Sequence, residues 1–311
     1  ASYLVAGWDA QPRAALVDGL ERFWLDVMAA DPCRGGALRP RLDPMPLLRP
    51  GCVLRRPLAT LGRFAGDLWH VLRDRLAHVR RAFGGAPRPI ADRVLDLTDF
   101  STVLAVDGLM DALRAHVDFA ALTRSSRRLR ITTTGWDGKV HLFEGEEMDA
   151  ARGPEIVRAS CAIPGMLPSV VIDGARFVDG SMLLYAPVQP AIEAGVDEIH
   201  LVHMNTHVAS EPVPRAFNST ENLFRSLVMM WNTAIEFEVE RVRWHNAQVA
   251  AGLIDGRQLT LHRYYPLSGY EGTMSFTNLD ADRLQESIEA GLREARDHDC
   301  ERCGCVLPTS G

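Results

Sequence analysis

Lysine is almost missing from this sequence, and so are long apolar runs. Lys139 is the single lysine among the 34 basic residues of the 311-residue chain, so arginine carries nearly all of the positive charge. No apolar run approaches the roughly 20 residues that a membrane-spanning helix needs. Residues 1–10 also lack the basic start, apolar core and cleavage site of a signal peptide. With 47% hydrophobic and 24% charged residues, the composition is that of a soluble globular protein.

The cysteines do not have the spacing of a small disulfide-rich domain. They are Cys33, Cys52, Cys161, Cys300, Cys303 and Cys305. A reducing, cytoplasmic location is therefore expected. The last three cysteines follow His298 in the pattern H-x-C-x-x-C-x-C, which metal-ligand chemistry would allow to hold zinc. Because a second, spaced pair of ligands is absent, we expect free thiols on this tail and predict neither a metal nor another cofactor.

Positive charge is concentrated in residues 31–93. This segment holds thirteen arginines against five aspartates, a net charge of +8, whereas the whole chain carries −6. Within it, residues 58–83 show the apolar periodicity of an amphipathic helix. An arginine-rich helix with aromatic residues suits an anionic membrane surface, so the segment is interpreted as a lid or a peripheral membrane contact. The alternative is a solvated arginine face on a packed helix. Nucleic acid is not expected as a partner, because the rest of the chain is acidic.

Helical and strand patterns alternate along the rest of the chain. Strands alternating with helices predict one α/β domain, with a mostly parallel sheet covered on both faces. The expected helices are 3–28, 58–83, 101–115, 154–162, 190–194, 219–250 and 280–297, with Asn278 or Asp280 as the cap of the last one. The expected strands are 129–134, 139–143, 170–172, 176–178, 199–204 and 259–264. Residues 31–51 are rich in proline and glycine and are expected to form a loop.

The densest functional signal is the segment 158–188, RASCAIPGMLPSVVIDGARFVDGSMLLYAPV. A short helix ends at Ile163-Pro164, and Asp173-Gly174 predicts a hairpin turn between two short strands. The second strand then delivers Asp179-Gly180 onto a loop. A strand fixes the carboxylate in place and glycine allows close approach, so Asp179 suits the role of a catalytic base. An isolated Asp-Gly pair, by contrast, is usually no more than a turn.

The whole segment resembles the second motif of the patatin-like phospholipases, A-S-x-A-I-P-G-x-F-P-P, then I-D-G-x-x-Y-V-D-G-G, then N-x-P-V. The matching residues are Ala159, Ser160, Ala162, Ile163, Pro164, Gly165, Pro168, Ile172, Asp173, Gly174, Val178, Asp179, Gly180, Pro187 and Val188. Residues 100–122, 129–143 and 195–199 and the C-terminal helix also look like parts of that family. The resemblance covers residues 1 to about 30 and 95–297, and it leaves out the basic segment.

This resemblance implies a three-layer α/β/α fold and a Ser–Asp dyad. In such a dyad a serine in a G-x-S-x-G elbow attacks an acyl ester, and the aspartate takes its proton directly. A glycine-rich loop supplies the oxyanion hole. By resemblance Asp179 is the base, with Gly180, Ser181, Ile163 and Pro164 as the supporting motif. The implied substrate is a phospholipid, lysophospholipid or other acyl-ester lipid.

Two parts of the family pattern have no counterpart in these residues. There is neither a G-x-S-x-G elbow nor a glycine-rich oxyanion loop. Residues 1–7 resemble the helix that follows the elbow, which would place the nucleophile about six residues before Ala1 and make Ser2 a helical residue without the tight elbow geometry. We therefore expect an N-terminally incomplete hydrolase that is inactive as given. Within the Asp motif, Ser181 replaces a glycine or alanine and Tyr185 an asparagine.

The expected organisation is an acyl hydrolase domain over 1–299, with 31–93 as its basic insert or lid, followed by a cysteine-containing tail, 300–311. Two alternatives to a lipid hydrolase remain open. One is a catalytically silent lipid-binding or regulatory relative. The other is a storage-polyester (polyhydroxyalkanoate) depolymerase, which uses the same dyad logic. His200, His203 and His207 are expected to be structural, because the dyad needs no histidine.

Overall fold

The computed structural model describes residues 1–29, 33, 36–55, 57–84, 89, 104–204, 219–266 and 280–308. Contacts divide the chain into two compact units. The first comprises residues 1–182 and 277–284, and the second comprises 183–276 and 285–311. Asp179 and its surrounding motif lie in the first unit, whereas the cysteine-containing tail lies in the second.

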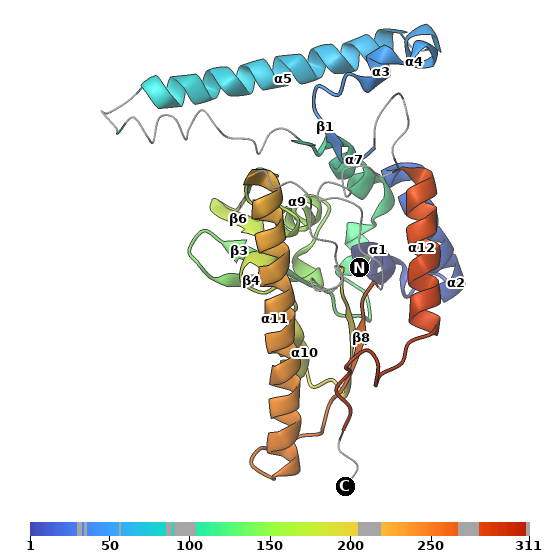
Figure 1. Ribbon diagram of the computed structural model, residues 1–311, viewed down its shortest axis with the longest axis vertical. Helices are drawn as coiled ribbons and strands as arrows, with labels where there is room; N and C mark the ends of the chain where they lie inside the picture. The colour runs from blue at the N-terminus through green and yellow to red at the C-terminus, as the bar shows by residue number, and fades with distance from the viewer. Residues whose placement is uncertain are drawn as a thin grey trace. The chain divides into compact units, whose positions relative to one another are not determined.

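A four-stranded sheet of order β4-β3-β6-β5 forms the centre of the first unit (Figure 1). Its strands are β3 (Arg130–Gly135), β4 (Val140–Glu144), β5 (Val170–Ile172) and β6 (Ala175–Asp179). All of its pairings are antiparallel. The expected mostly parallel sheet is therefore not confirmed: among the described strands only β7 and β8, in the second unit, pair in parallel. The cause is the two tight hairpins, because a short turn can join only antiparallel neighbours.

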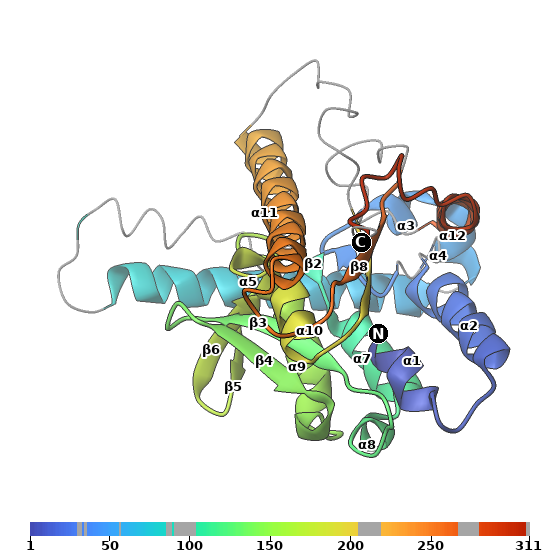
Figure 2. The same ribbon diagram turned by 90° about the horizontal axis from the view of Figure 1, so that it is seen from below.

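Helix α9 (Arg152–Ser160) lies against this sheet and contacts β3, β5 and β6 (Figure 2). Ile156 and Ala159 on α9 are completely buried there. The same apolar core takes in residues of α1 (Ser2–Gly7), α7 (Asp107–His116) and α8 (Phe119–Leu122). Its members include Ala6, Met110, Leu113, Phe119, Leu122, Phe143, Met148, Ile172 and Phe177. The N-terminal helix and the Asp motif are thus parts of one packed core.

Two of the expected helices are wrong in extent. The helix expected over 3–28 is three elements: α1, α2 (Arg13–Arg22) and the π-helix η1 (Phe23–Met28), with a break that ends at Pro12. Proline has no N–H to donate and begins a helix more readily than it continues one. The helix expected over 101–115 begins only at Asp107. The preceding Leu104–Ala105 form strand β2, which pairs with β1 (Arg39–Pro40), and 101–103 lie outside the described residues.

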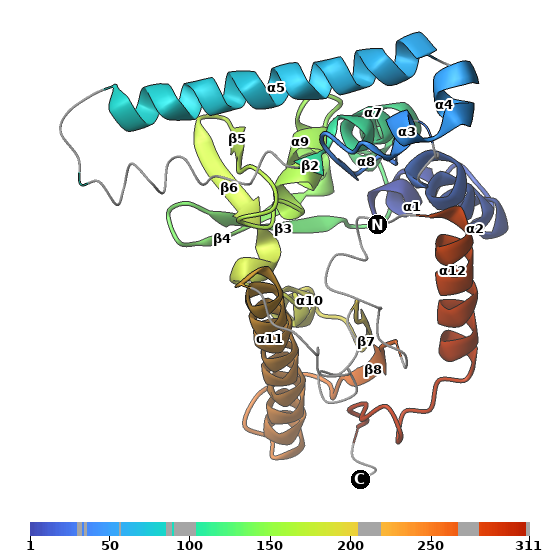
Figure 3. The same cartoon turned by 45° about the horizontal axis from the view of Figure 1, so that its top comes forward.

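The basic segment contains more helix than expected. The loop expected over 31–51 contains helix α3 (Met45–Leu48) and the start of helix α4 (Pro50–Arg55). The helix expected over 58–83 is confirmed as the long helix α5 (Pro57–Phe83) (Figure 3). A disulfide joins Cys33 to Cys52. Disulfides persist in oxidising compartments. This pairing therefore does not fit the reducing location that the cysteine spacing led us to expect.

Helix α5 turns polar residues inward and apolar residues outward. Thr60, Asp67 and His78 are buried, and Asp67 accepts hydrogen bonds from Arg39 at 2.6 and 2.9 Å. The exposed side chains include Leu58, Leu61, Leu68, Trp69, Leu72, Leu76, Val79 and Phe83. Among the described residues, no helix is long and apolar enough to cross a membrane.

The second unit is built on the parallel pair β7 (Glu198–Val202) and β8 (Thr260–Tyr264). Helix α10 (Val188–Glu193) and the long helix α11 (Ser219–Ala250), orange in Figure 1, share its apolar core. Asn246 on α11 donates to the carbonyl of Leu259 at 2.8 Å and accepts from the Leu259 N–H at 2.7 Å. The helices and strands expected here are confirmed within one or two residues. Helix α12 (Ala281–Arg296) is confirmed too, and Asp280 accepts a hydrogen bond from the Asp282 N–H, as the expected cap does.

Candidate active site around Asp179

The hairpin β5–β6 carries Asp179 to the end of a strand. Its turn residues, Asp173 and Gly174, have φ angles of 50° and 81°, which is the geometry that an Asp-Gly hairpin turn requires. Strand β6 ends at Asp179, which lies opposite the fully buried Thr133 of β3. The predicted hairpin is therefore confirmed. It places Asp179 at the C-terminal end of β6, where β6 is paired with β3.

A backbone hydrogen bond ties the end of this strand to the segment that follows α9. The N–H of Asp179 donates to the carbonyl of Ala162 at 3.0 Å, which ties the strand to the segment that follows α9. That segment then turns over Ile163, whose carbonyl accepts the N–H groups of Met166 and Leu167 at 3.1 and 3.0 Å. Ile163 is half-buried and Pro164 is exposed. Ile163 and Pro164 are thus linked to Asp179 through Ala162, which precedes them in the chain and accepts the backbone N–H of Asp179.

Gly180 lies where no larger residue fits. A Cβ at this position would be 2.4 Å from both the carbonyl oxygen and the Oγ1 of Thr132 on β3. The chain therefore needs glycine to pass this close to the neighbouring strand. Gly180 begins the short helical turn η3 (Gly180–Met182), in which the Ser181 N–H donates to Oδ1 of Asp179 at 2.7 Å. The close approach thereby sets the direction of the carboxylate.

Burial makes Asp179 a better proton acceptor than an ordinary aspartate. The residue is 8% exposed. Burial raises the pKa of its carboxyl group above the ordinary value, and hydrogen bonding to Ser181 only partly opposes this rise. Among the described residues no cationic side chain forms an ion pair with Asp179. A carboxylate in this setting gains basicity, which is the change that proton abstraction near neutral pH requires.

Cys161 lies close to Asp179 and to the start of the chain. Desolvation by the surrounding protein, and then the charge of Asp179, raise the pKa of the Cys161 thiol to about 11, although part of the residue is accessible to solvent. The amino group of Ala1 also interacts electrostatically with this thiol. A protonated thiol is a poor nucleophile at neutral pH. Cys161 therefore lies near Asp179 but is not a candidate nucleophile.

The other residues singled out in the sequence fall outside this cluster. Ser2 is the first residue of the regular helix α1. Tyr185 belongs to the second unit, where its ring stacks on Trp231 at 5.4 Å. His200 and His203 also lie in the second unit. Burial, and then the charge of Arg263, lower the pKa of His203 to about 4, while His207 lies outside the described residues. The sequence did not single out Thr132, and it gave Ala162 only as a match to the family motif, because the contacts of both residues depend on the pairing of distant segments.

A protein-family model matches the larger part of the chain. The model of the patatin-like phospholipase family matches residues 2–192, a range that runs from α1 through the Asp motif to α10. No curated protein matches the chain. The match covers more than half of the 311 residues. The chain belongs to the patatin-like phospholipase family.

Proposed function

We propose that this chain is the aspartate-bearing part of a lipid acyl-ester hydrolase, in which Asp179 is the base of a Ser–Asp dyad and the serine precedes Ala1. The observation that carries the proposal is the buried carboxylate of Asp179 at the end of β6, with its raised pKa and its Ser181 hydrogen bond. Membership of the patatin-like phospholipase family supports lipid acyl hydrolysis as the general activity.

The hydrogen bond to Ser181 occupies Oδ1 of Asp179 and leaves Oδ2 to take a proton. In the proposed first step Oδ2 removes the hydroxyl proton of the serine while its Oγ attacks the ester carbonyl carbon. The tetrahedral intermediate collapses to an acyl-enzyme, and the alcohol departs with the proton from Asp179. In the second step Asp179 deprotonates a water molecule, which attacks the acyl-enzyme. The carboxylic acid is released and the serine regains its proton.

The packing of α1 supports the proposed entry of the serine. Ala6 on α1 belongs to the same apolar core as Ala159, Ala162 and Ile172, which flank the Asp motif. At the start of this helix, the amino group of Ala1 interacts with Cys161, which in turn interacts with Asp179. A segment that joined the chain at Ala1 would therefore begin in the neighbourhood of Cys161, beside Asp179. We propose that the chain needs such a segment for activity.

The two Asp-Gly pairs of the hairpin provide a matched experiment. The reading frame is extended upstream of Ala1, and the extended protein is assayed on phospholipid vesicles, lysophospholipid, short-chain esters and a storage polyester. Asp179→Asn is expected to abolish ester hydrolysis, because an amide cannot accept the proton. Asp173→Asn is the control: this side chain is 69% exposed and the turn tolerates asparagine. Activity retained in both variants would refute the base assignment. An upstream segment without G-x-S-x-G would refute the dyad and favour the catalytically silent relative.

We also propose that α5 binds the surface of anionic membranes. Its exposed leucines, Trp69 and Phe83 fall on one face at 3.6 residues per turn. The exposed Arg73 and Arg80 lie beside this face, and residues 31–93 carry a net charge of +8. An apolar face bordered by arginines is the pattern of helices that lie in a lipid headgroup layer. The opposite face, with Asp67 and His78, is buried against the protein.

Tryptophan substitutions test this membrane contact. Trp69 on α5 and Trp136 in the turn between β3 and β4 are 68% and 72% exposed, so either can be replaced without loss of core packing. Trp69→Ala is expected to lower the affinity of the chain for phosphatidylglycerol-containing vesicles by about tenfold or more, since a large apolar side chain contributes about 1.5–3 kcal/mol when buried. Trp136→Ala is expected to bind as the unsubstituted chain does. Equal effects of the two substitutions, or equal binding to pure phosphatidylcholine vesicles, would exclude this role for α5.

A further inference from the structure

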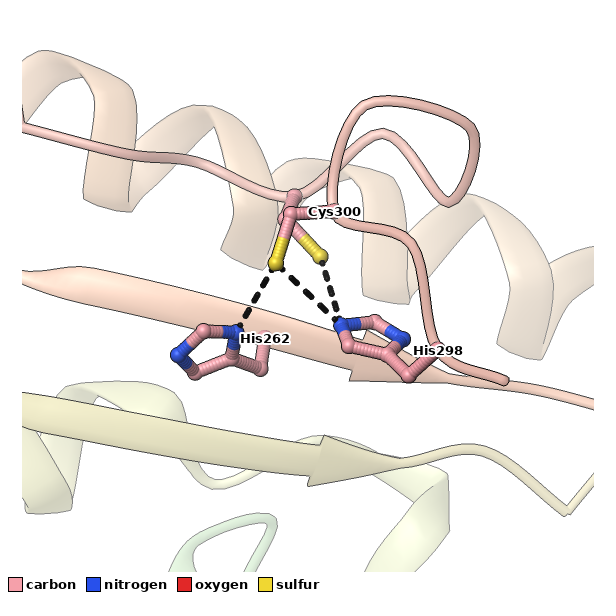
Figure 4. Close-up of side chains that lie close together, drawn as sticks. His262, His298 and Cys300 are labelled. Carbon is pink, nitrogen blue, oxygen red and sulfur yellow. Dashed lines mark hydrogen bonds between the residues drawn. The ribbon is translucent and has the colours of Figure 1, made fainter. Parts of the chain in front are cut away.

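Four metal-ligating side chains meet in the second unit. His262 comes from β8, and His298, Cys300 and Cys305 come from the segment that follows α12. Their ligand atoms all lie within 4.8 Å of one another. Figure 4 shows the rings of His262 and His298 pointing toward the sulfur of Cys300. Three of the four candidate ligands of the tail pattern are thus joined by a ligand from a distant strand, while Cys303 is not part of the set.

The distances within this cluster are those of a compact site. Nδ1 of His262 is 3.1 Å from Sγ of Cys300, and Sγ of Cys300 is 3.4 Å from Nε2 of His298. The same Nε2 is 3.4 Å from Sγ of Cys305. Around a tetrahedral zinc ion, bond lengths of about 2.0–2.3 Å place neighbouring ligand atoms roughly 3.3–3.8 Å apart. These three distances lie within a few tenths of an ångström of that spacing, and the remaining pairs of ligand atoms lie within 4.8 Å of each other.

A carboxylate holds the His262 ring in the orientation that a metal needs. While Nδ1 faces the cluster, Nε2 lies 3.0 Å from the Oε1 of Glu198 on the neighbouring strand β7. Histidine ligands almost always donate their second ring N–H to a carboxylate, a carbonyl or water, and this bond fixes the tautomer that leaves the other nitrogen free to bind. The arrangement of Glu198 and His262 is the carboxylate–histidine pair that accompanies zinc.

The backbone supports the two sulfur ligands in a similar way. The N–H of Arg263 donates to Sγ of Cys305 at 3.2 Å, a contact that stabilises a thiolate. The N–H of Cys305 donates to the carbonyl of Cys300 at 2.9 Å, which closes the turn that brings the two sulfurs together. Beyond the turn, Leu261 and Val306 exchange backbone hydrogen bonds of 2.8 and 3.1 Å. The tail is thereby aligned along β8 with its ligands directed at His262.

We propose that His262, His298, Cys300 and Cys305 bind one Zn²⁺ ion in a structural site. Two thiolates and two imidazoles in a tetrahedral arrangement select zinc among the common divalent metals. The set is closed: all four ligands come from the protein, which leaves no coordination position for a substrate and marks the site as structural. The ion joins the C-terminal segment to β8. It is independent of the dyad proposed for the first unit.

Metal analysis tests the site directly. The 311-residue chain is purified with a phosphine reductant, stripped with a chelator, loaded with excess ZnCl₂ and passed through gel filtration before elemental analysis. We expect one zinc ion per chain, and none in the Cys300→Ser, Cys305→Ser double variant. Cys303→Ser is the matched control, because Cys303 lies in the same tail but outside the ligand set. A chain that retains no zinc, a double variant that retains it, or a Cys303→Ser variant that loses it would overturn the proposal.

Cobalt provides a readout that does not depend on a variant that folds. Co²⁺ loaded in place of zinc is expected to show the visible bands of a tetrahedral ion and the near-ultraviolet charge-transfer bands of two thiolate ligands. Cys300→Ser alone is expected to remove about half of the charge-transfer intensity, since this intensity follows the number of sulfur ligands. An octahedral spectrum without thiolate bands in the unsubstituted chain would overturn the ligand set.

Discussion

Replacing Gly180 by alanine tests the packing that directs Asp179. The added Cβ would lie 2.4 Å from the carbonyl oxygen of Thr132, about 1 Å inside ordinary van der Waals contact. The hydroxyl of Thr132 can rotate away, but its carbonyl belongs to β3, which pairs with β4 on one side and β6 on the other. Overpacking costs about 1–3 kcal/mol, and a clash with paired backbone belongs at the upper end. A loss of about 3 kcal/mol lowers the folding equilibrium constant roughly a hundredfold.

Hydrogen exchange followed by mass spectrometry measures this loss where it occurs. A chain with two compact units need not unfold in one step, so exchange of β6 peptides reports on the first unit by itself. Gly66→Ala on α5 is the control, because a Cβ there meets no atom within 4 Å and alanine favours helix by about 1 kcal/mol. We expect faster exchange of β6 in Gly180→Ala and no loss of protection in Gly66→Ala. A Gly180→Ala variant within about 0.5 kcal/mol of the unsubstituted chain would refute the packing argument.

Two further predictions concern stability. Burial raises the pKa of Asp179, so the folded state binds the proton more tightly than the unfolded state, and this group contributes stability at low pH that is lost as pH rises through the folded pKa. At pH 7, Asp179→Asn is therefore expected to unfold at a higher urea concentration than the unsubstituted chain. The gain in the free energy of unfolding is about 1.4 kcal/mol per unit by which the pKa of Asp179 is raised, and it should vanish toward pH 3. An equal gain at both pH values would contradict the pKa shift. Asn246→Ala leaves the buried N–H and carbonyl of Leu259 without their partner, so a loss of about 2–4 kcal/mol is expected in the exchange of β8 peptides, and an unchanged exchange rate would show that this pairing contributes nothing.

Local signals in the sequence were sufficient for the hairpin and for the position of Asp179. An Asp-Gly pair between two short β-branched runs specifies a two-residue turn, because both residues must adopt positive φ and these two residue types do so at little cost. Asp173 and Gly174 have that geometry. The boundaries of β6, α5 and α11 could be predicted for a similar reason, since each follows from periodicity and end signals within a few neighbouring residues.

The direction of strand pairing could not be obtained in the same way. Alternating helix and strand patterns favour a parallel sheet, and this expectation for the sheet as a whole took no account of the short turn at 135–138 or of the hairpin that the sequence itself predicts at 173–174. A connection of two to four residues cannot carry the chain back to the start of a parallel neighbour, so β3 with β4 and β5 with β6 must be antiparallel. The pairing of β3 with β6 depends on contacts between residues more than 40 positions apart in the chain, for which the sequence gives no local sign.

The cluster around His262 was beyond the sequence for a related reason. His298, Cys300, Cys303 and Cys305 lie within eight residues and were recognised as candidate ligands, but no second, spaced ligand could be identified to complete a zinc site with them. His262 lies 36 residues before His298, in strand β8. The alternating burial pattern of this strand does not mark His262 as a metal ligand. The backbone bridge between Leu261 and Val306, which no local pattern predicts, sets the register that brings His262 to the tail.

The geometry around Asp179 implies that reactivity and stability oppose each other in the first unit. Burial raises the pKa of Asp179, so its ionised form is destabilising, and no cationic side chain among the described residues pairs with it. The Ser181 N–H offsets part of this cost by donating to the carboxylate, while the Ala162 carbonyl and the close approach of Gly180 to Thr132 hold the backbone on either side of it. Each of these also fixes where the carboxylate points. Because the residues that make Asp179 tolerable are those that direct it, a substitution that relaxes the packing at Gly180 will let water reach the carboxylate, lower its pKa and weaken it as a base.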